Sequence, residues 1–239
     1  YPIRHTGIKF RKVEGELFLP QYTHLMARLI DKLKGDAVIA VKPRPTSYGV
    51  ALLHRELTGR PVILDIDDDE MAFYDGDSWK NWERKTLLRR PNSPLYIKML
   101  QSMIPQADAV IAASRELQRR HGGHYLTHVK DPEELEPGRY NGAGERQKRE
   151  IPQEERIVLF AGTPRAHKGL ELLLEALKKM NRQDVRLLVV GFSNDPDNQY
   201  ENKLREEGGE LLYGLKQVPF QELPAILAMA DVVALPQLD

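Results

Sequence analysis

The loop between an apolar strand and a leucine-rich helix carries the residue types best suited to chemistry. In "RIVLFAGTPRAHKGLELLLEALKKM", residues 156–180, Gly162 permits a tight turn, and Arg165 and Lys168 stand just before the helix. Exposed N–H groups at a helix N-terminus bind anions, and the two basic side chains add charge-assisted donors. The spacing differs from the P-loop and from G-x-G-x-x-G. The segment therefore indicates either a phosphate or diphosphate site, or an ordinary strand-to-helix turn with two solvated bases.

A second candidate is the acidic run "VILDIDDDEMAFYDGD", residues 62–77, in which seven carboxylates follow a buried strand. Such a run can hold a metal ion, act in acid–base chemistry, or face water. For Asp65 and Asp67, close to the strand end, we expect a catalytic role. The remaining five carboxylates are expected to form a solvated loop: Asp68, Asp69, Glu70, Asp75 and Asp77.

Two further groups of residues have both a functional and a purely structural interpretation. His121, His124 and His128 resemble a metal-ligand spacing, but they lie in a loop without a helix to set their geometry, which favours solvated or locally hydrogen-bonded side chains. The segment "WKNWERKTLLRR", residues 79–90, mixes tryptophans with basic residues. It suits either peripheral contact with an anionic membrane or a basic helix that packs its aromatic side chains inward.

Apolar strands alternating with helices must position these residues, and this alternation predicts an α/β fold with parallel sheets covered by helices on both faces. The pattern runs once, passes through a stretch rich in Gly, Pro and charge at 121–150, and restarts. We therefore expect two Rossmann-like domains, residues 1–150 and 151–239. Strands are expected at 37–41, 61–66, 108–114, 156–162, 185–191 and 231–236, with a short one at "ELLYG". Helices are expected at 22–34, 46–59, 79–103 with a break, 115–121, 169–180, 199–207 and 221–230.

Composition narrows the class of protein. The 239 residues contain 41% hydrophobic residues, enough for a core, and 35 basic against 35 acidic residues, so net charge does not point to nucleic acid. The absence of cysteine excludes disulfides and fits a cytoplasmic protein. The chain lacks an apolar run long enough to span a bilayer. Because it starts without Met and stops just after an expected strand, we expect both ends to be cuts inside a larger fold.

Several segments together resemble the family-4 glycosyltransferases of the GT-B fold. Gly162, Lys168 and Gly169 match that family's G-R-x4-K-G donor loop, with Thr163 at the place of the Arg. "VPFQELPAILAMADVVALPQ" is similar to the family's V-P-x-x-E-L-P segment and the strand after it, and "ADAVIAASREL" resembles the end of its N-terminal domain. The family's first strand would precede Tyr1, and its Glu-x7-Glu motif would follow Asp239.

The resemblance implies two Rossmann-like domains in a GT-B arrangement and a retaining transfer of a sugar from a nucleotide-diphosphate sugar to a hydroxyl acceptor. It implies donor diphosphate binding by Gly162, Thr163, Arg165 and Lys168. Asp67 falls on the family's acceptor-side His, so it would orient or deprotonate the acceptor hydroxyl. "DID" and "DDD" also fit the Asp-x-Asp metal motif of the other glycosyltransferase fold, but GT-B enzymes need no such metal, so neither metal nor cofactor is expected.

Alternatives to a complete transferase stay open. One is another GT-B enzyme, such as a sugar-nucleotide epimerase. Another is a GT-B piece that binds nucleotide but is inactive without a complementing segment or a second copy. Partners expected from the sequence are a nucleotide sugar and a hydroxyl acceptor, with no nucleic acid and with peripheral membrane contact as a further option.

Overall fold

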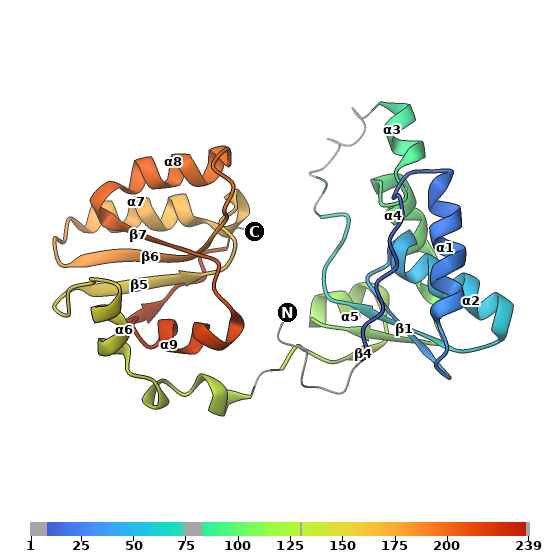
Figure 1. The fold of residues 1–239 in the computed structure, drawn as a ribbon, viewed down its shortest axis with the longest axis horizontal. Helices are drawn as coiled ribbons and strands as arrows, with labels where there is room; N and C mark the ends of the chain where they lie inside the picture. Colours follow the sequence, from blue (N-terminus) through green and yellow to red (C-terminus); the bar gives the residue numbers. More distant parts are fainter. Residues whose placement is uncertain (1–8, 73, 75–82, 130, 238–239) are drawn as a thin grey trace. The chain divides into compact units, whose positions relative to one another are not determined.

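The computed structural model describes residues 9–72, 74, 83–129 and 131–237. Within them, 9–129 and 131–237 form two compact units, called here the N-terminal and C-terminal units. Each unit is built around its own four-stranded parallel sheet with helices packed on it (Figure 1). The predicted fold class, α/β with two parallel sheets flanked by helices, is confirmed. Among the described residues, no helix combines the length and apolarity needed to cross a membrane.

In the N-terminal unit the strands lie in chain order, β1-β2-β3-β4, all parallel. The strands are β1 (Val38–Val41), β2 (Val62–Ile66), β3 (Ala109–Ala112) and β4 (His124–Tyr125), and the helices are α1 (Gln21–Lys32), α2 (Val50–Thr58, continuing a π-helical turn Pro45–Gly49), α3 (Arg84–Arg89), α4 (Pro94–Ser102) and α5 (Arg115–His121). Right-handed crossovers between strands in sequential order place every connecting helix on the same face. This sheet is therefore expected to be covered on one side.

Burial along the strands agrees with that topology. Alternate residues such as Ala40, Leu64 and Ala112 pack into one core with side chains of α2, α4 and α5. On the opposite face, Ile39 is 62% exposed and Val41 50% exposed. Among the described residues, no second core cluster forms on this face. The expectation of helices on both faces is thus wrong for this unit, because periodicity predicts strands but not their order in the sheet.

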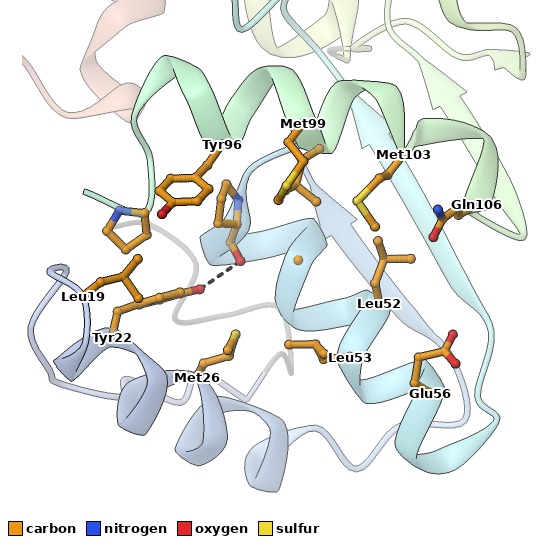
Figure 2. A pocket seen from close by; sticks show the side chains of 14 residues that line it. Leu19, Tyr22, Met26, Leu52, Leu53, Glu56, Tyr96, Met99, Met103 and Gln106 are labelled. Atoms are coloured by element: carbon orange, nitrogen blue, oxygen red, sulfur yellow. Dashed lines mark hydrogen bonds between the residues drawn. The ribbon is translucent and has the colours of Figure 1, made fainter. Parts of the chain in front are cut away.

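The helices of the N-terminal unit also frame a cavity. It has a volume of about 390 Å³ and opens between α1, α2 and α4 (Figure 2). Its wall is formed mainly by aliphatic, aromatic and methionine side chains, with Leu52 and Leu53 from α2 and Met99 from α4. Leu53 and Met99 remain 42% and 48% exposed, so the cavity is open to solvent.

In the C-terminal unit the strand order is β7-β6-β5-β8, again all parallel. The elements are α6 (Gly142–Lys148), β5 (Arg156–Ala161), α7 (Leu170–Met180), β6 (Val185–Phe192), α8 (Gln199–Gly208), β7 (Leu212–Lys216), α9 (Leu223–Leu227) and β8 (Val232–Val233). After β7 the chain returns across the sheet to pair β8 with β5, so α7 and α8 cover one face while α6 and α9 cover the other (Figure 1).

Two cores confirm this doubly covered arrangement. One lies under α7 and α8 and includes Leu174 and Phe192, and the other lies under α9 and includes Leu159 and Ile226. α7 buries Leu170, Leu174 and Leu177, as the helical spacing predicts.

The structure differs from the sequence-based expectations at three places in this half of the chain. The units divide near 130, whereas the predicted boundary lay at 150, and the stretch expected to be linker contains α6. Arg146 of α6 is buried and donates to Met229 O at 2.9 and 2.6 Å, which ties the helix to the C-terminal unit. The expected buried strand at 231–236 is a two-residue edge strand with both residues exposed.

Candidate functional site

The loop after β5 has a backbone that only glycine adopts easily. Gly162 has φ +154° and donates its N–H to Val190 O at 2.8 Å. Thr163 and Arg165 are exposed, and Pro164 between them is buried. A 3₁₀ turn, Ala166–Lys168, then leads into Gly169, whose φ of +69° turns the chain into α7. The predicted strand–turn–helix is confirmed, and its two basic side chains lie on the loop.

Glycine at two positions allows the backbone of neighbouring segments to pack closely against this loop. A Cβ on Gly191, at the end of β6, would lie 2.2 Å from Gly162 O. A Cβ on Gly169 would lie 1.9 Å from Pro236 O, in the segment after β8. Both distances are far below a normal contact, so neither position accepts a side chain without movement of the backbone. The loop is therefore held between the ends of two neighbouring strands.

The position of the loop in the sheet favours ligand binding. After β5 the chain runs through α7 to β6, which neighbours β5 on one side. The strand on the other side of β5 is β8, which the chain reaches after crossing the opposite face of the sheet. Ligands of open α/β sheets bind beyond the carboxyl ends of strands at such a switch point. Lys168 Nζ donates to Gln237 Oε1 at 3.0 Å, which joins the loops after β5 and β8 at this point.

The helix that follows adds to the anion-binding character of the loop. α7 starts at Leu170 without a side-chain cap, so its first-turn N–H groups are not satisfied by a capping oxygen. Lys168 stands two residues before this helix and is half-buried. Unsatisfied N–H groups, the positive end of the helix dipole and an adjacent ammonium together suit a phosphate group.

A buried glutamate shapes the next loop and was not singled out from the sequence. Glu201 of α8 is 3% exposed and accepts from Ser193 N at 3.1 and 2.9 Å and from Ser193 Oγ at 3.0 Å. These bonds fix the chain just after β6, next to Gly191. The sequence signal was weak, because a glutamate in a polar helix normally faces water.

Comparison with known proteins agrees with this geometry. Residues 143–239 match the family model described as glycosyl transferases group 1. YtcC of Bacillus subtilis (strain 168), whose name classes it as a candidate glycosyltransferase, is 31% identical over 88 residues, or 34% of this chain and 22% of that protein.

Solved structures extend the similarity of fold beyond residues 143–239. Sucrose-phosphate synthase from Thermosynechococcus elongatus aligns over 92% of this chain and 54% of its own, with TM-score 0.64 and 18% identity. HepE of Anabaena, in complex with UDP and glucose, aligns over 90% of this chain and 56% of its own, with TM-score 0.68 and 16% identity. The chain thus spans about half the length of these structures.

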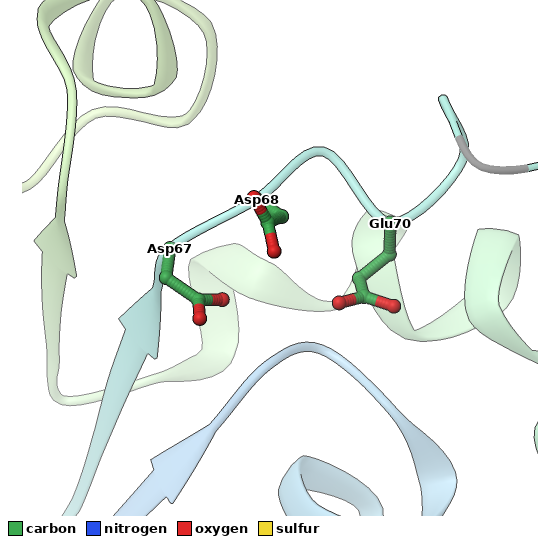
Figure 3. A group of neighbouring side chains, drawn as sticks. All are labelled: Asp67, Asp68 and Glu70. Atoms are coloured by element: carbon green, nitrogen blue, oxygen red, sulfur yellow. The ribbon is translucent and has the colours of Figure 1, made fainter. Parts of the chain in front are cut away.

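In the N-terminal unit, the acidic run surrounds a lysine from the neighbouring strand. Lys42, directly after β1, has its Nζ 3.3 Å from Asp67 Oδ1, 2.8 Å from Asp68 Oδ2 and 3.1 Å from Glu70 Oε1. Burial acts to lower the pKa of Lys42, but its hydrogen bond with Asp68 and its interaction with Glu70 outweigh this and raise the pKa. The lysine is therefore a firmly charged centre for the three carboxylates, which Figure 3 shows.

The prediction that the later acids form a solvated loop is wrong for Asp69 and Glu70. Glu70 is fully buried and accepts from Arg44 Nε at 2.5 Å. Asp69 accepts from Met71 N and from Gln101 Nε2, each at 3.1 Å, and pairs with Arg120. Asp68 is exposed yet bound to Lys42. These basic partners lie far away in the sequence, so local charge counting could not reveal them. Asp75 and Asp77 lie outside the described residues.

Asp65 and Asp67 differ in their surroundings. Asp65 lies within β2, paired with Val41 and Ile111 on the face that lacks helices. Asp67 follows the strand end, and its Oδ1 is buried within ion-pair distance of Lys42 but lacks a hydrogen bond. Of the two carboxylates, Asp67 is the one that the structure places in a cluster of charged groups at the carboxyl end of the sheet.

The same cluster contains the oxygen atoms that a cation would need. One carboxylate oxygen from each of Asp67, Asp68 and Glu70 lies within 4.8 Å of the others. The Lys42 ammonium lies among them, so a metal ion would have to displace it. Within the described ranges, His121, His124 and His128 are not brought together as ligands. Trp79, Lys80 and Trp82 lie outside those ranges.

Sequence reasoning missed Lys42. It has φ +69°, an uncommon conformation for a lysine, and its N–H bonds to Asp65 O at 2.8 Å. A signal was available, because "AVIAV" and "PVILDI" were both predicted as parallel strands, and the residues just after such strands meet at one edge of the sheet.

Proposed function

We propose that this chain is part of a glycosyltransferase that moves a sugar from a nucleotide-diphosphate sugar to a hydroxyl acceptor. The observation that carries the proposal is the loop Gly162–Gly169 at the switch point of a group 1 domain, with Lys168 beside the loop after β8. The relatives with glycosyltransferase names, and the complexes of HepE with UDP and glucose and with UDP-glucose, support a nucleotide-diphosphate donor.

In this proposal the loop binds the donor diphosphate. The Thr163 N–H, exposed by the turn at Gly162, and the N–H groups at the start of α7 contact phosphate oxygens, while Arg165 and Lys168 supply positive charge. When the bond between sugar and phosphate breaks, negative charge grows on the leaving diphosphate. Fixed donors aimed at that charge stabilise the transition state more than the ground state.

The acceptor would be served by Asp67, with Asp65 as a neighbouring carboxylate, and the transfer would retain the configuration at the sugar carbon. Asp67 belongs to a cluster of three carboxylates and two cations, Lys42 and Arg44, and the cluster lies where ligands of parallel sheets bind. The Asp67 side chain is 24% exposed, so an incoming hydroxyl group can reach its carboxylate. Lys42 holds the side chain in place through the ion pair.

Asp67→Asn tests this role in the full-length protein. We expect turnover to fall by roughly 10²-fold or more, the usual cost of losing a general base, while donor affinity stays the same. Asp68→Asn is the matched control, because it also removes a carboxylate from Lys42 but at an exposed position. Equal losses in the two variants would show that Asp67 only anchors Lys42.

We further propose that no divalent metal takes part. Lys168 and Arg165 would neutralise the donor phosphates, and Lys42 already lies between the carboxylates that could hold a cation. Nucleotide binding should therefore persist in excess EDTA. Loss of binding in EDTA, restored by Mg²⁺ or Mn²⁺, would contradict this part of the proposal.

The reaction itself is tested with the full-length protein, labelled UDP- and GDP-sugars and a panel of hydroxyl acceptors. The proposal predicts a glycosylated product that depends on both donor and acceptor. Hydrolysis or isomerisation of the donor without an acceptor would indicate an epimerase-like enzyme. Binding without any conversion would indicate a nucleotide-binding module.

A further inference from the structure

The cavity between α1, α2 and α4 has the size and lining of a ligand site but lies apart from the residues assigned above. Its volume of about 390 Å³ falls within the range of small-molecule pockets. Met26, Met99 and Met103 line it, which is half of the six methionines in the chain. Methionine side chains adapt to flexible apolar ligands, so a clustering of this kind suits a hydrocarbon chain.

Polar atoms in the cavity wall are directed to partners in the protein. Tyr22 Oη donates to Pro45 O at 2.9 Å, shown as the dashed line in Figure 2. Tyr96 Oη donates to Leu88 O at 2.9 Å. The rings of both tyrosines therefore present carbon to the cavity, and a ligand there meets an apolar surface with few groups to desolvate.

A basic pocket adjoins one end of this cavity. It has a volume of about 380 Å³, and Lys85, Arg89 and Arg90 line it together with one acid, Glu16. The two pockets share the chain steps Phe18–Leu19 and Arg90–Pro91, and Leu19 N donates to Arg89 O at 2.8 Å. Among the residues that the structure describes, the three basic side chains form no ion pair.

The two ends of the cavity differ in charge, because three basic side chains lie at one end only. Leu19 and Tyr96 lie near the basic pocket, while Glu56 and Gln106 lie at the far end of the cavity (Figure 2). Arg90 also lies over the ring of Phe18, with its guanidinium carbon 5.7 Å from the ring centre, which holds it beside the junction. An anionic group would be attracted to the basic end, whereas Glu56 at the far end is paired with Arg55 at 3.3 Å.

We propose that the N-terminal unit binds an anionic amphiphile with a single hydrocarbon chain. The chain lies in the methionine-lined cavity, and a phosphate group at its end lies against Lys85, Arg89 and Arg90. This site goes beyond the proposed glycosyl transfer and does not depend on it, because none of its residues belongs to the donor loop or to the acidic cluster.

The test is calorimetric titration of the 239-residue chain with dodecyl phosphate below its critical micelle concentration. We expect saturable binding of one molecule per chain. Decyl phosphate, which is two methylenes shorter, should bind about sixteenfold more weakly, because each buried methylene contributes about fourfold to the dissociation constant. Inorganic phosphate should bind at least 100-fold more weakly, and neutral dodecyl maltoside about tenfold more weakly than dodecyl phosphate.

Paired variants separate the site from general detergent binding. Leu53→Gln in the cavity and Arg90→Gln in the basic pocket should each weaken dodecyl phosphate binding about tenfold. Leu57→Gln, on the same helix as Leu53 but 73% exposed and outside the cavity, should not change it. Arg84→Gln, at the start of the helix that Arg90 follows but outside both pockets, should not change it either. Circular dichroism checks that all four variants are folded.

Three outcomes would overturn the proposal. Absence of saturable binding would show that the cavity does not bind an anionic amphiphile. Equal affinity for dodecyl maltoside and dodecyl phosphate would show that the basic pocket does not bind the phosphate group. Equal losses in Leu53→Gln and Leu57→Gln would show adsorption of detergent to the surface.

Discussion

At the scale of single residues, Asp231 has a structural role, although it lies in the segment "VPFQELPAILAMADVVALPQ" that resembles the glycosyltransferase family. It accepts from Ile157 N at 2.8 Å, Arg146 Nη2 at 2.9 Å and Arg156 Nη1 at 2.8 Å. Burial acts to raise the pKa of Asp231, but these hydrogen bonds outweigh it and lower the pKa to about 2. The carboxylate therefore ties α6 and the start of β5 to the segment that begins β8.

The lowered pKa predicts how Asp231 affects stability. Because the folded-state pKa lies below the usual value, Asp231 stabilises the fold above about pH 4, and this contribution is lost as the pH falls through about 2. Asp231→Asn should lower the free energy of unfolding by about 2 kcal/mol at pH 7, and the difference from wild type should narrow to about 1 kcal/mol at pH 3.

Urea denaturation at the two pH values measures this difference. Asp184→Asn is the control, because Asp184 forms an exposed ion pair with Arg182 and should matter little. A loss for Asp231→Asn that did not depend on pH would show that the packing of the side chain, and not its charge, is what counts.

At the scale of elements, the donor loop depends on how closely β6 approaches it. Gly191 has φ +132° and contacts the backbone of Gly162 and Thr163. The loop and the end of β6 are thus packed closely together. A change in β6 should therefore alter nucleotide binding at the proposed diphosphate site.

Gly191→Ala tests this coupling. The added Cβ would lie 2.2 Å from Gly162 O, so the loop must move. We expect nucleotide binding to weaken at least tenfold and stability to fall by about 2 to 4 kcal/mol, the sum of backbone strain and steric displacement. Gly209→Ala is the matched control, because Gly209 also has positive φ but its Cβ would meet nothing within 4 Å. Similar behaviour of the two variants would contradict the coupling.

Elements set by local pattern were predictable from the sequence, and elements set by distant contacts were not. The strand β5, Gly162 and α7 follow from an apolar run, a glycine and a repeat of leucines, all within 25 residues of chain. Arg146 and Lys42 were missed, because their partners Met229 and Asp67 are brought to them by the fold. Periodicity also gave the strands of the N-terminal sheet but not the order that leaves one face without helices.

At the scale of the whole molecule, two units with separate cores should fold as separate domains. They differ in how completely their sheets are covered. The C-terminal sheet has a core on each face, while the N-terminal sheet exposes Ile39 and Val41. A parallel sheet with an open apolar face is expected to attract hydrophobic partners.

Separate expression of 9–129 and 131–237 tests this difference. The C-terminal fragment should unfold cooperatively and stay monomeric. The N-terminal fragment should bind the hydrophobic dye ANS more strongly and associate at higher concentration, and Ile39→Thr with Val41→Thr should reduce both effects. Equal ANS binding by the two fragments would show that the open face does not behave as an apolar surface.

The proposed function depends on binding of a nucleotide diphosphate by the loop Gly162–Gly169 through Lys168. Calorimetric titration of the chain with UDP and GDP, comparing wild type with Lys168→Ala and Lys178→Ala, measures this binding. Lys178 lies at the far end of α7 and is exposed, so it controls for loss of a positive charge from the same helix. Lys168→Ala should weaken binding by about 1 to 3 kcal/mol, the value of a charge-assisted hydrogen bond, with stability nearly unchanged, and Lys178→Ala should bind as wild type does. Equal affinity of wild type and Lys168→Ala would show that Lys168 does not bind the diphosphate and would contradict the proposed donor site.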